Sequence, residues 1–131
     1  MLTKFGGIMS KFTTPLIGEW NDEMTKFTLR ESFVYYVGSL NSNDKIEIPV
    51  GYVTDFASVP EKLHWLLHPV GPYGKAAVLH DYLYDKGLRT KKEADLIFLE
   101  AMGVLKVPKY IRYTMYYAVK YFGKGNYDKN V

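Results

Sequence analysis

The sequence of 131 residues contains no cysteine. This absence excludes disulfide bonds, cysteine nucleophiles and metal centres built on thiolates. No apolar run approaches the roughly 18 residues that a membrane-spanning helix requires. The basic start of the chain, Met1–Met9, also lacks the apolar stretch of a secretory signal. We therefore expect neither a signal peptide nor a transmembrane segment, and no membrane partner.

A strong excess of charge of either sign is also missing. The chain has 17 basic and 14 acidic residues, a formal net charge of +3. A dedicated nucleic-acid-binding protein usually has a more concentrated basic region, so we do not expect nucleic acid as a partner. The last predicted helix does place Lys109, Arg112, Tyr116 and Lys120 on one side. Such a face can bind nucleic acid, but a solvated basic face is its commoner explanation.

Tyrosine, in contrast, is abundant, and the first half of the chain has the pattern of β-structure. Twelve residues are tyrosine, which we interpret as an aromatic core with hydroxyl groups at its edge. Residues 26–40 are dense in β-branched and aromatic side chains, and residues 45–54 follow after the polar turn Asn41–Asp44. We predict two antiparallel strands joined by this turn, with Pro49 at an edge or a bulge.

The second half has helical signals. We predict a short helix from the capping box at Ser58 to about His68, a helix over Lys75–Lys86 that ends at Gly87, and a helix from the Thr90–Glu93 capping box to about Met102. A last helix has Pro108 in its first turn, ends at Gly123 and carries a buried stripe, formed by Ile111, Met115, Ala118, Val119 and Phe122.

Strands followed by helices, without alternation, predict an α+β fold. We expect an N-terminal antiparallel β-hairpin or small sheet packed on a C-terminal set of three to four helices. The length predicts a single domain over residues 1–131. Within it, residues 1–54 are mainly β, residues 55–123 mainly α, and residues 124–131 form a polar tail.

The most informative segment is the helix around His80 and Asp81. From Ala76 to Tyr84, all residues except His80 and Asp81 are apolar or aromatic, which is typical of a buried helix. Buried polar groups need partners, and these can be a hydrogen-bonded network that orders the core, or a metal ion or substrate. Both alternatives stay open for His80 and Asp81.

Two further carboxylates are candidates for the same site. Asp55 follows a predicted strand, where it can be functional or can form an Asx turn. Asp95 can face His80 or Asp81 across a helical hairpin, or interact with its own helix dipole. We interpret Ser58 as a helix cap rather than a nucleophile, since no nucleophile-elbow motif surrounds it. His64 and His68 have helical i, i+4 spacing but lack the glutamate of a zincin motif, so we do not expect metal there.

Three motifs together resemble an uncharacterised family of small proteins, found mainly in bacteriophages and prophages and known as a domain of unknown function. They are TDFASVP at Thr54–Pro60, AAVLHDYLY at Ala76–Tyr84 and KKEAD at Lys91–Asp95. The likeness extends to Met115–Gly123. It implies a phage origin and a shared core, consisting of Thr54, Asp55, Ser58, Pro60, His80, Asp81 and Asp95, but no settled activity.

Two functions follow as hypotheses. In the first, the protein is a hydrolase, with Asp55, His80, Asp81 and Asp95 as catalytic residues. One divalent metal ion held by His80, Asp81 and Asp55 would assist it, or His80 would act as the base beside Asp81 or Asp95. In the second, the protein is a non-enzymatic virion component or host-interaction factor with phage or host protein partners, and the cluster is a structural polar network. The host cytoplasm or the virion is the expected location.

Overall fold

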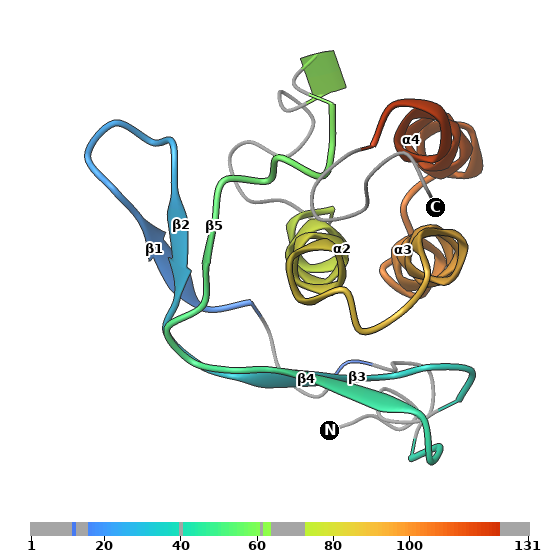
Figure 1. Ribbon diagram of the computed structural model, residues 1–131, viewed down its shortest axis with the longest axis horizontal. Helices are drawn as coiled ribbons and strands as arrows, with labels where there is room; N and C mark the ends of the chain where they lie inside the picture. The colour runs from blue at the N-terminus through green and yellow to red at the C-terminus, as the bar shows by residue number, and fades with distance from the viewer. Residues whose placement is uncertain (1–11, 13–15, 40, 61, 64–72, 124–131) are drawn as a thin grey trace. The chain divides into compact units, whose positions relative to one another are not determined.

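The computed structural model describes residues 12, 16–39, 41–60, 62–63 and 73–123. It has antiparallel β-structure from N-terminal strands and three C-terminal helices, which confirms the predicted α+β class (Figure 1). The chain divides into two compact units, Met1–Asp55 and Phe56–Val131. This division lies within one residue of the predicted boundary between the β half and the α half. The single-domain organisation stays a prediction.

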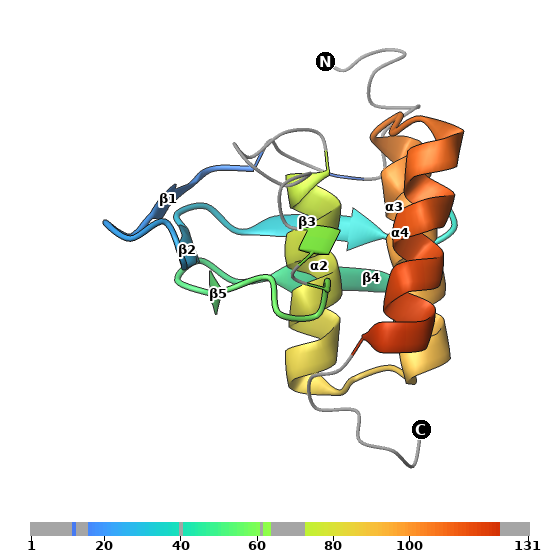
Figure 2. The same ribbon diagram turned by 90° about the horizontal axis from the view of Figure 1, so that it is seen from above.

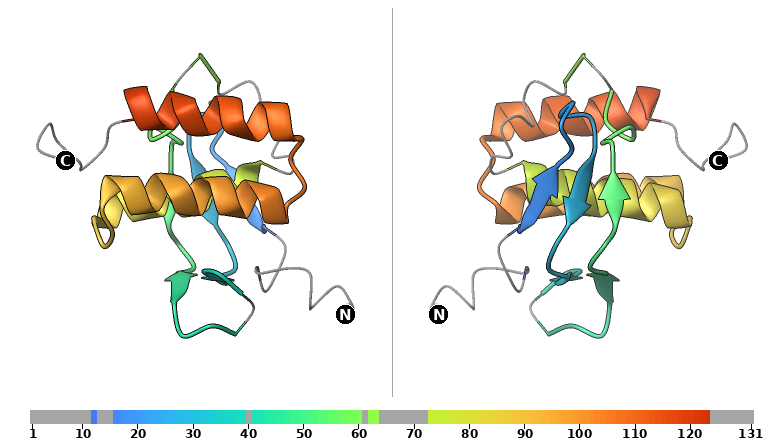
Figure 3. Two further views of the ribbon diagram at one scale, coloured as in Figure 1. Left: turned by 90° about the vertical axis from the view of Figure 1, so that its right-hand side faces the viewer. Right: turned by 90° about the vertical axis from the view of Figure 1, so that its left-hand side faces the viewer.

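The N-terminal unit contains two small antiparallel sheets. Strands β1 (Gly18–Trp20), β2 (Phe27–Leu29) and β5 (Val53–Thr54) form one of them, in the order β1-β2-β5 (Figure 3). Strands β3 (Phe33–Tyr36) and β4 (Lys45–Ile48) form the other. Each of the two predicted strands is therefore split into two shorter ones. The second is interrupted directly before Pro49, which cannot donate a ladder hydrogen bond.

The register of the β3–β4 pair explains its apolar face. Phe33 pairs with Ile48, and Tyr35 pairs with Ile46. All four side chains are buried, whereas their neighbours along the strands are half-buried or exposed. Because successive side chains of a strand point to opposite faces, this alternation places the core on one face of the pair.

The C-terminal unit contains three helices. These are α2 (Gly74–Lys86), α3 (Lys91–Val104) and α4 (Lys109–Phe122), and α3 packs against both of the others (Figures 1 and 2). Helix α2 ends at Gly87, which has a φ of 61°, a left-handed conformation that glycine adopts without strain. Helix α3 begins with the predicted capping box between Thr90 and Glu93. The three helices predicted from Lys75 onwards are thus confirmed, with boundaries close to the predicted ones.

Two expectations for the α half need comment. Phe122 does not join the buried stripe of α4: it is 70% exposed, because it is the last residue of α4 and lies beyond the turn at which Lys91 of α3 contacts α4. Of the other residues of the stripe, Met115 and Val119 are buried, and Ile111 and Ala118 are half-buried. The helix predicted from Ser58 to about His68, together with His64 and His68, falls largely outside the described residues.

None of the helices in the described part of the chain combines the length and the apolar character that crossing a bilayer requires.

Candidate functional site

Helix α2 carries the central residue of the site, His80, in a fully buried position. Ten of the 13 residues of α2 are buried, which confirms the prediction from its apolar circumference. The imidazole ring of His80 is 0% exposed and stacks on Phe98, with ring centroids 4.5 Å apart. The Tyr84 ring lies one turn further along α2, 4.3 Å from the imidazole. Aromatic packing on these sides fixes the plane of the imidazole.

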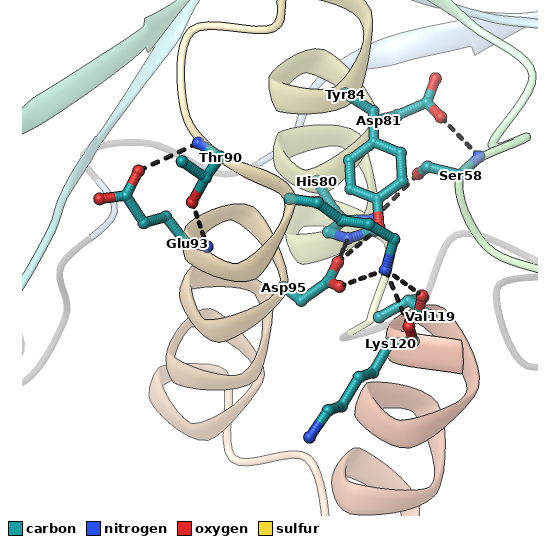
Figure 4. A network of polar contacts seen from close by, with 10 residues as sticks. Ser58, His80, Asp81, Tyr84, Thr90, Glu93, Asp95, Val119 and Lys120 are labelled. Carbon is teal, nitrogen blue, oxygen red and sulfur yellow. Dashed lines mark hydrogen bonds and ion pairs between the residues drawn. The ribbon is translucent and has the colours of Figure 1, made fainter. Parts of the chain in front are cut away.

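Both imidazole nitrogens of His80 are hydrogen-bonded. Nε2 lies 2.7 Å from Oδ1 of Asp95 on α3, and Nδ1 lies 3.0 Å from Oγ of Ser58 (Figure 4). Ser58 precedes α2 in the chain and is itself buried. His80 therefore links a hydroxyl on one side to a carboxylate on the other.

Asp95 accepts hydrogen bonds on both of its carboxylate oxygens. Its Oδ1 also accepts a hydrogen bond of 2.6 Å from the Tyr84 hydroxyl, and its Oδ2 accepts one of 2.8 Å from the Lys91 ammonium group. The same Lys91 Nζ donates to the backbone oxygens of Val119 and Lys120, at 2.9 and 3.0 Å. The Asp95 carboxylate is thus bonded to α2 through His80 and Tyr84, and Lys91 connects it to the last turn of α4.

Asp81 lies next to His80 in sequence and contacts the same residue, Ser58. Its Oδ1 accepts a hydrogen bond of 2.9 Å from the Ser58 backbone N–H. The Asp81 side chain is buried like that of His80. The backbone of Ser58 is therefore fixed by Asp81, while its hydroxyl group faces His80.

The protonation state of His80 follows from its surroundings. Burial lowers the pKa of His80 below its ordinary value, and the nearby Asp95 offsets this only in part. Burial by itself would raise the pKa of Asp95, but hydrogen bonds from His80, Lys91 and Tyr84 lower it. At neutral pH, Asp95 is therefore ionised and His80 is neutral. Because an ionised carboxylate only accepts, Nε2 carries the proton and Nδ1 has a lone pair directed at the Ser58 hydroxyl.

The segment before Ser58 has an unusual backbone. Phe56 has a φ of 61°, a left-handed conformation that is rare for a bulky residue, and its side chain is buried. Such backbone strain is found preferentially at functional sites, where the surrounding structure holds it in place. The strained turn brings Ser58 to His80 and Asp81.

The structure brings together His80, Asp81 and Asp95 of the four predicted catalytic residues. Asp55 belongs to the N-terminal unit, so its proximity to His80 stays a prediction. Two contributors, Ser58 and Lys91, were not among the predicted catalytic residues. Ser58 was interpreted as a helix cap, and Lys91 was not singled out, although its i, i+4 spacing from Asp95 is a recognisable signal for an ion pair.

The metal-assisted version of the site finds no support in the geometry. A histidine ligand needs a free nitrogen lone pair for the metal, but hydrogen bonds to Asp95 and Ser58 engage both nitrogens of His80. Within the described ranges, no group of three or more histidine, aspartate or glutamate side chains is arranged to hold a metal ion. These residues fit a hydrogen-bonded relay better than a metal centre.

A cavity of about 370 Å³ reaches the Asp95 side of the site. It lies between α3 and α4 and is lined by Lys91, Lys92, Asp95, Tyr116 and Lys120. The lining includes the carboxylate that orients His80 but not the imidazole itself. Solvent therefore approaches the relay from its carboxylate end.

Comparison with known proteins identifies the family but not an activity. No curated protein and no solved structure matches the chain. A family model described as "Protein of unknown function (DUF1353)" matches residues 27–119, from β2 to the last turns of α4. That range covers well over half of the chain and includes Ser58, His80, Asp81 and Asp95. The chain therefore belongs to the DUF1353 family of proteins of unknown function.

Proposed function

We propose that this protein is a small hydrolase of phage origin that works by acid–base chemistry without a metal ion. His80 is the general base, and Asp95 orients it and stabilises its charged form. The observation that carries the proposal is the hydrogen-bonded sequence from Ser58 Oγ to His80 Nδ1 and from His80 Nε2 to Asp95. A hydroxyl group, an imidazole and a carboxylate in this order resemble the relay of acyl-transferring hydrolases, with the two imidazole nitrogens exchanged: here Nδ1 faces the hydroxyl and Nε2 faces the carboxylate.

The relay defines a reaction on a carboxylic ester or amide. As Ser58 Oγ attacks the carbonyl carbon, His80 Nδ1 takes the hydroxyl proton, and it then gives that proton to the leaving oxygen or nitrogen. A water molecule next cleaves the acyl–Ser58 ester with the same base. The ionised Asp95 stabilises the imidazolium formed in each half of the reaction.

Asp81 and Phe56 support this role of Ser58. The bond from the Ser58 backbone N–H to Asp81 fixes the nucleophile, and the left-handed Phe56 sets the turn that presents it. Ser58 and His80 are both buried, so the 56–60 segment has to move for substrate to enter. Strained, buried turns of this kind are common where a loop opens and closes over a site.

One observation favours the second candidate function, a non-enzymatic virion component or host-interaction factor. Within the described residues, every buried side-chain nitrogen and oxygen atom has a hydrogen-bond partner. A fully paired, buried network can serve only to specify the fold. In that case His80 and Asp95 contribute stability, and Ser58 has no special reactivity.

Covalent labelling separates the two functions. Purified protein is treated with a fluorophosphonate probe, and the site of modification is located by mass spectrometry. We expect the hydrolase to be labelled at Ser58, with labelling lost in Ser58→Ala and His80→Gln. Ser42 is the control, because its hydroxyl donates to backbone oxygens rather than to a base. Probe on Ser42 but not on Ser58, or equal labelling of Ser58 in the His80→Gln variant, would contradict the proposal.

Turnover of p-nitrophenyl esters from acetate to octanoate provides the kinetic test. Loss of the serine, the base or its orienting carboxylate is expected to lower kcat about 10³-fold or more. The assay is run with EDTA and with added calcium, magnesium, manganese or zinc. Activity unchanged by EDTA supports the metal-free mechanism, whereas activity that depends on one of these cations would refute it.

A further inference from the structure

The outer face of α4 is unusual for a solvent-exposed helix. Four tyrosines lie along it, and we call them the tyrosine stripe: Tyr110, Tyr113, Tyr117 and Tyr121, which are 76%, 38%, 49% and 68% exposed. Their spacings of three and four residues place them on one face over about 17 Å of helix. A helix of a soluble domain normally presents charged and polar residues there. The stripe therefore needs an explanation beyond packing.

Ring contacts connect three tyrosines of the stripe, Tyr113, Tyr117 and Tyr121. The Tyr113 and Tyr117 centroids are 6.5 Å apart, and those of Tyr117 and Tyr121 are 6.3 Å apart with their planes only 14° from parallel. The Tyr116 ring contacts Tyr117 from the side, at 5.1 Å. The result is a row of aromatic groups along the outside of the helix, in which Tyr117 and Tyr121 are nearly parallel and Tyr113 is tilted by 35° from Tyr117.

Positive charge runs along one edge of the stripe. Helix α4 contains Lys109, Arg112 and Lys120 and no aspartate or glutamate. The Lys120 ammonium group lies 5.8 Å from the Tyr117 ring centroid and 5.5 Å from that of Tyr121. The ammonium group thus lies over both rings, within cation–π distance.

The cavity between α3 and α4 continues this positive edge. Its lining carries three lysines, and only one carboxylate, Asp95, which is bound to Lys91. Since Lys91 is engaged by Asp95 and by two backbone oxygens, Lys92 and Lys120 are the cations that a ligand can reach. Both lie on exposed parts of their helices. The cavity is therefore a polar, net positive hollow directly beside the aromatic row.

We propose that α4 and this cavity bind single-stranded nucleic acid, with bases stacking on the tyrosine stripe and phosphates at Lys92 and Lys120. An aromatic row with cations along one edge matches a strand whose bases and phosphates lie on separate sides. The composition of the whole chain predicts no such partner, but the structure concentrates charge and rings on one helix. A membrane surface fits less well, since the aliphatic side chains Ile111, Met115 and Val119 of α4 are buried or half-buried. The inference does not depend on the proposed hydrolase activity.

Fluorescence anisotropy with labelled 20-nucleotide dT and U oligomers tests the stacking. We expect the wild type to bind at 50 mM salt, and Tyr117→Ala/Tyr121→Ala to weaken the affinity at least tenfold, since each stacked base contributes about 1–3 kcal/mol. The matched variant Tyr117→Phe/Tyr121→Phe keeps the rings and should stay within about twofold of the wild type. Equal affinity of the alanine and wild-type proteins would overturn the proposal.

Salt dependence tests the phosphate contacts. Replacing Lys92 and Lys120 by alanine is expected to reduce the slope of log K against log salt by about 1.4, because each phosphate contact contributes about 0.7. The control is Lys26→Ala/Lys45→Ala, which removes the same charge from exposed positions of the N-terminal unit. An equal change of slope in the control would show non-specific attraction and refute the site. The proposal would also be refuted if the protein bound neither oligomer but bound anionic phosphatidylglycerol vesicles or self-associated through the stripe.

Discussion

Substitution of Asp95 by asparagine is the sharpest test of how the buried site is held together. Asp95 accepts three hydrogen bonds: two on Oδ1 from His80 and Tyr84, and one on Oδ2 from Lys91. Asparagine has the same shape but only one acceptor oxygen. If that oxygen keeps His80 and Tyr84, the new amide N–H₂ group faces the Lys91 ammonium group, donor against donor. In the reverse orientation the amide N–H₂ group faces the donors of both His80 and Tyr84, which is less favourable.

The magnitude follows from these contacts. Hydrogen bonds to a charged group contribute about 1.5–3 kcal/mol each, against about 1 kcal/mol for neutral pairs, so the two bonds that persist are weakened by roughly 1 kcal/mol each. Loss of the Lys91 ion pair adds about 1 kcal/mol, because the Lys91 side chain is 17% exposed and water can solvate part of its charge. We expect Asp95→Asn to lower the free energy of unfolding by about 3 kcal/mol in total.

Urea unfolding at pH 7, followed by far-ultraviolet circular dichroism, measures this loss. Asp22→Asn is the matched control, because it makes the same chemical change at an exposed turn position and is expected to alter stability by no more than about 0.5 kcal/mol. An Asp95→Asn protein as stable as this control would show that the carboxylate is not the centre of a buried network. The burial argument for both proposed functions would then fail.

Three further predictions concern the C-terminal unit. Burial lowers the pKa of His80, so below about pH 6.5 the unfolded chain binds a proton that the folded protein does not. The free energy of unfolding should therefore fall as the pH drops from 6.5 towards 5. Urea unfolding at a series of pH values should show this slope in the wild type and not in His80→Gln. Burial lowers the pKa of Lys75 to about 8, so between pH 8 and 10.5 the unfolded state binds more protons than the folded state. Over this range the free energy of unfolding of the wild type should rise with pH relative to that of Lys75→Met. Equal pH dependence of the two proteins would contradict this. Thr90→Ala removes the cap bond to the Glu93 N–H and should lower stability by about 1 kcal/mol in thermal unfolding, while Thr90→Ser should retain most of it.

Much of the α half could be predicted because its signals are local. The capping box at Thr90 and the glycine at position 87 mark helix ends through contacts within a few residues. The short connection between α2 and α3 makes these helices antiparallel neighbours, which is why a contact of Asp95 with His80 or Asp81 could be named as one of two alternatives. Apolar residues all around α2 predicted the burial of His80 in the same way.

The partners that the sequence did not reveal depend on tertiary structure. The contact between Ser58 and His80 spans 22 residues and depends on the left-handed turn at Phe56, for which a phenylalanine gives no local signal. A serine before a proline and a glutamate has the pattern of a helix cap wherever it occurs. Likewise, the division of each predicted strand into two shorter strands depends on how the strands pair. Only the break between β4 and β5 had a signal in the sequence, which was Pro49.

The arrangement around Asp95 meets the requirements of a general base as well as those of a structural network. A network that only specifies the fold needs each buried polar atom to have a partner, and beside an ionised Asp95 only the Nε2–H tautomer of His80 meets that need. Catalysis needs the same tautomer, with the lone pair on the nitrogen that faces the hydroxyl. Three donors converge on the Asp95 carboxylate, and together they keep it ionised, which in turn holds the proton on Nε2. The contacts that pair the buried atoms therefore also leave the Nδ1 lone pair directed at the Ser58 hydroxyl, which is the arrangement that a general base requires.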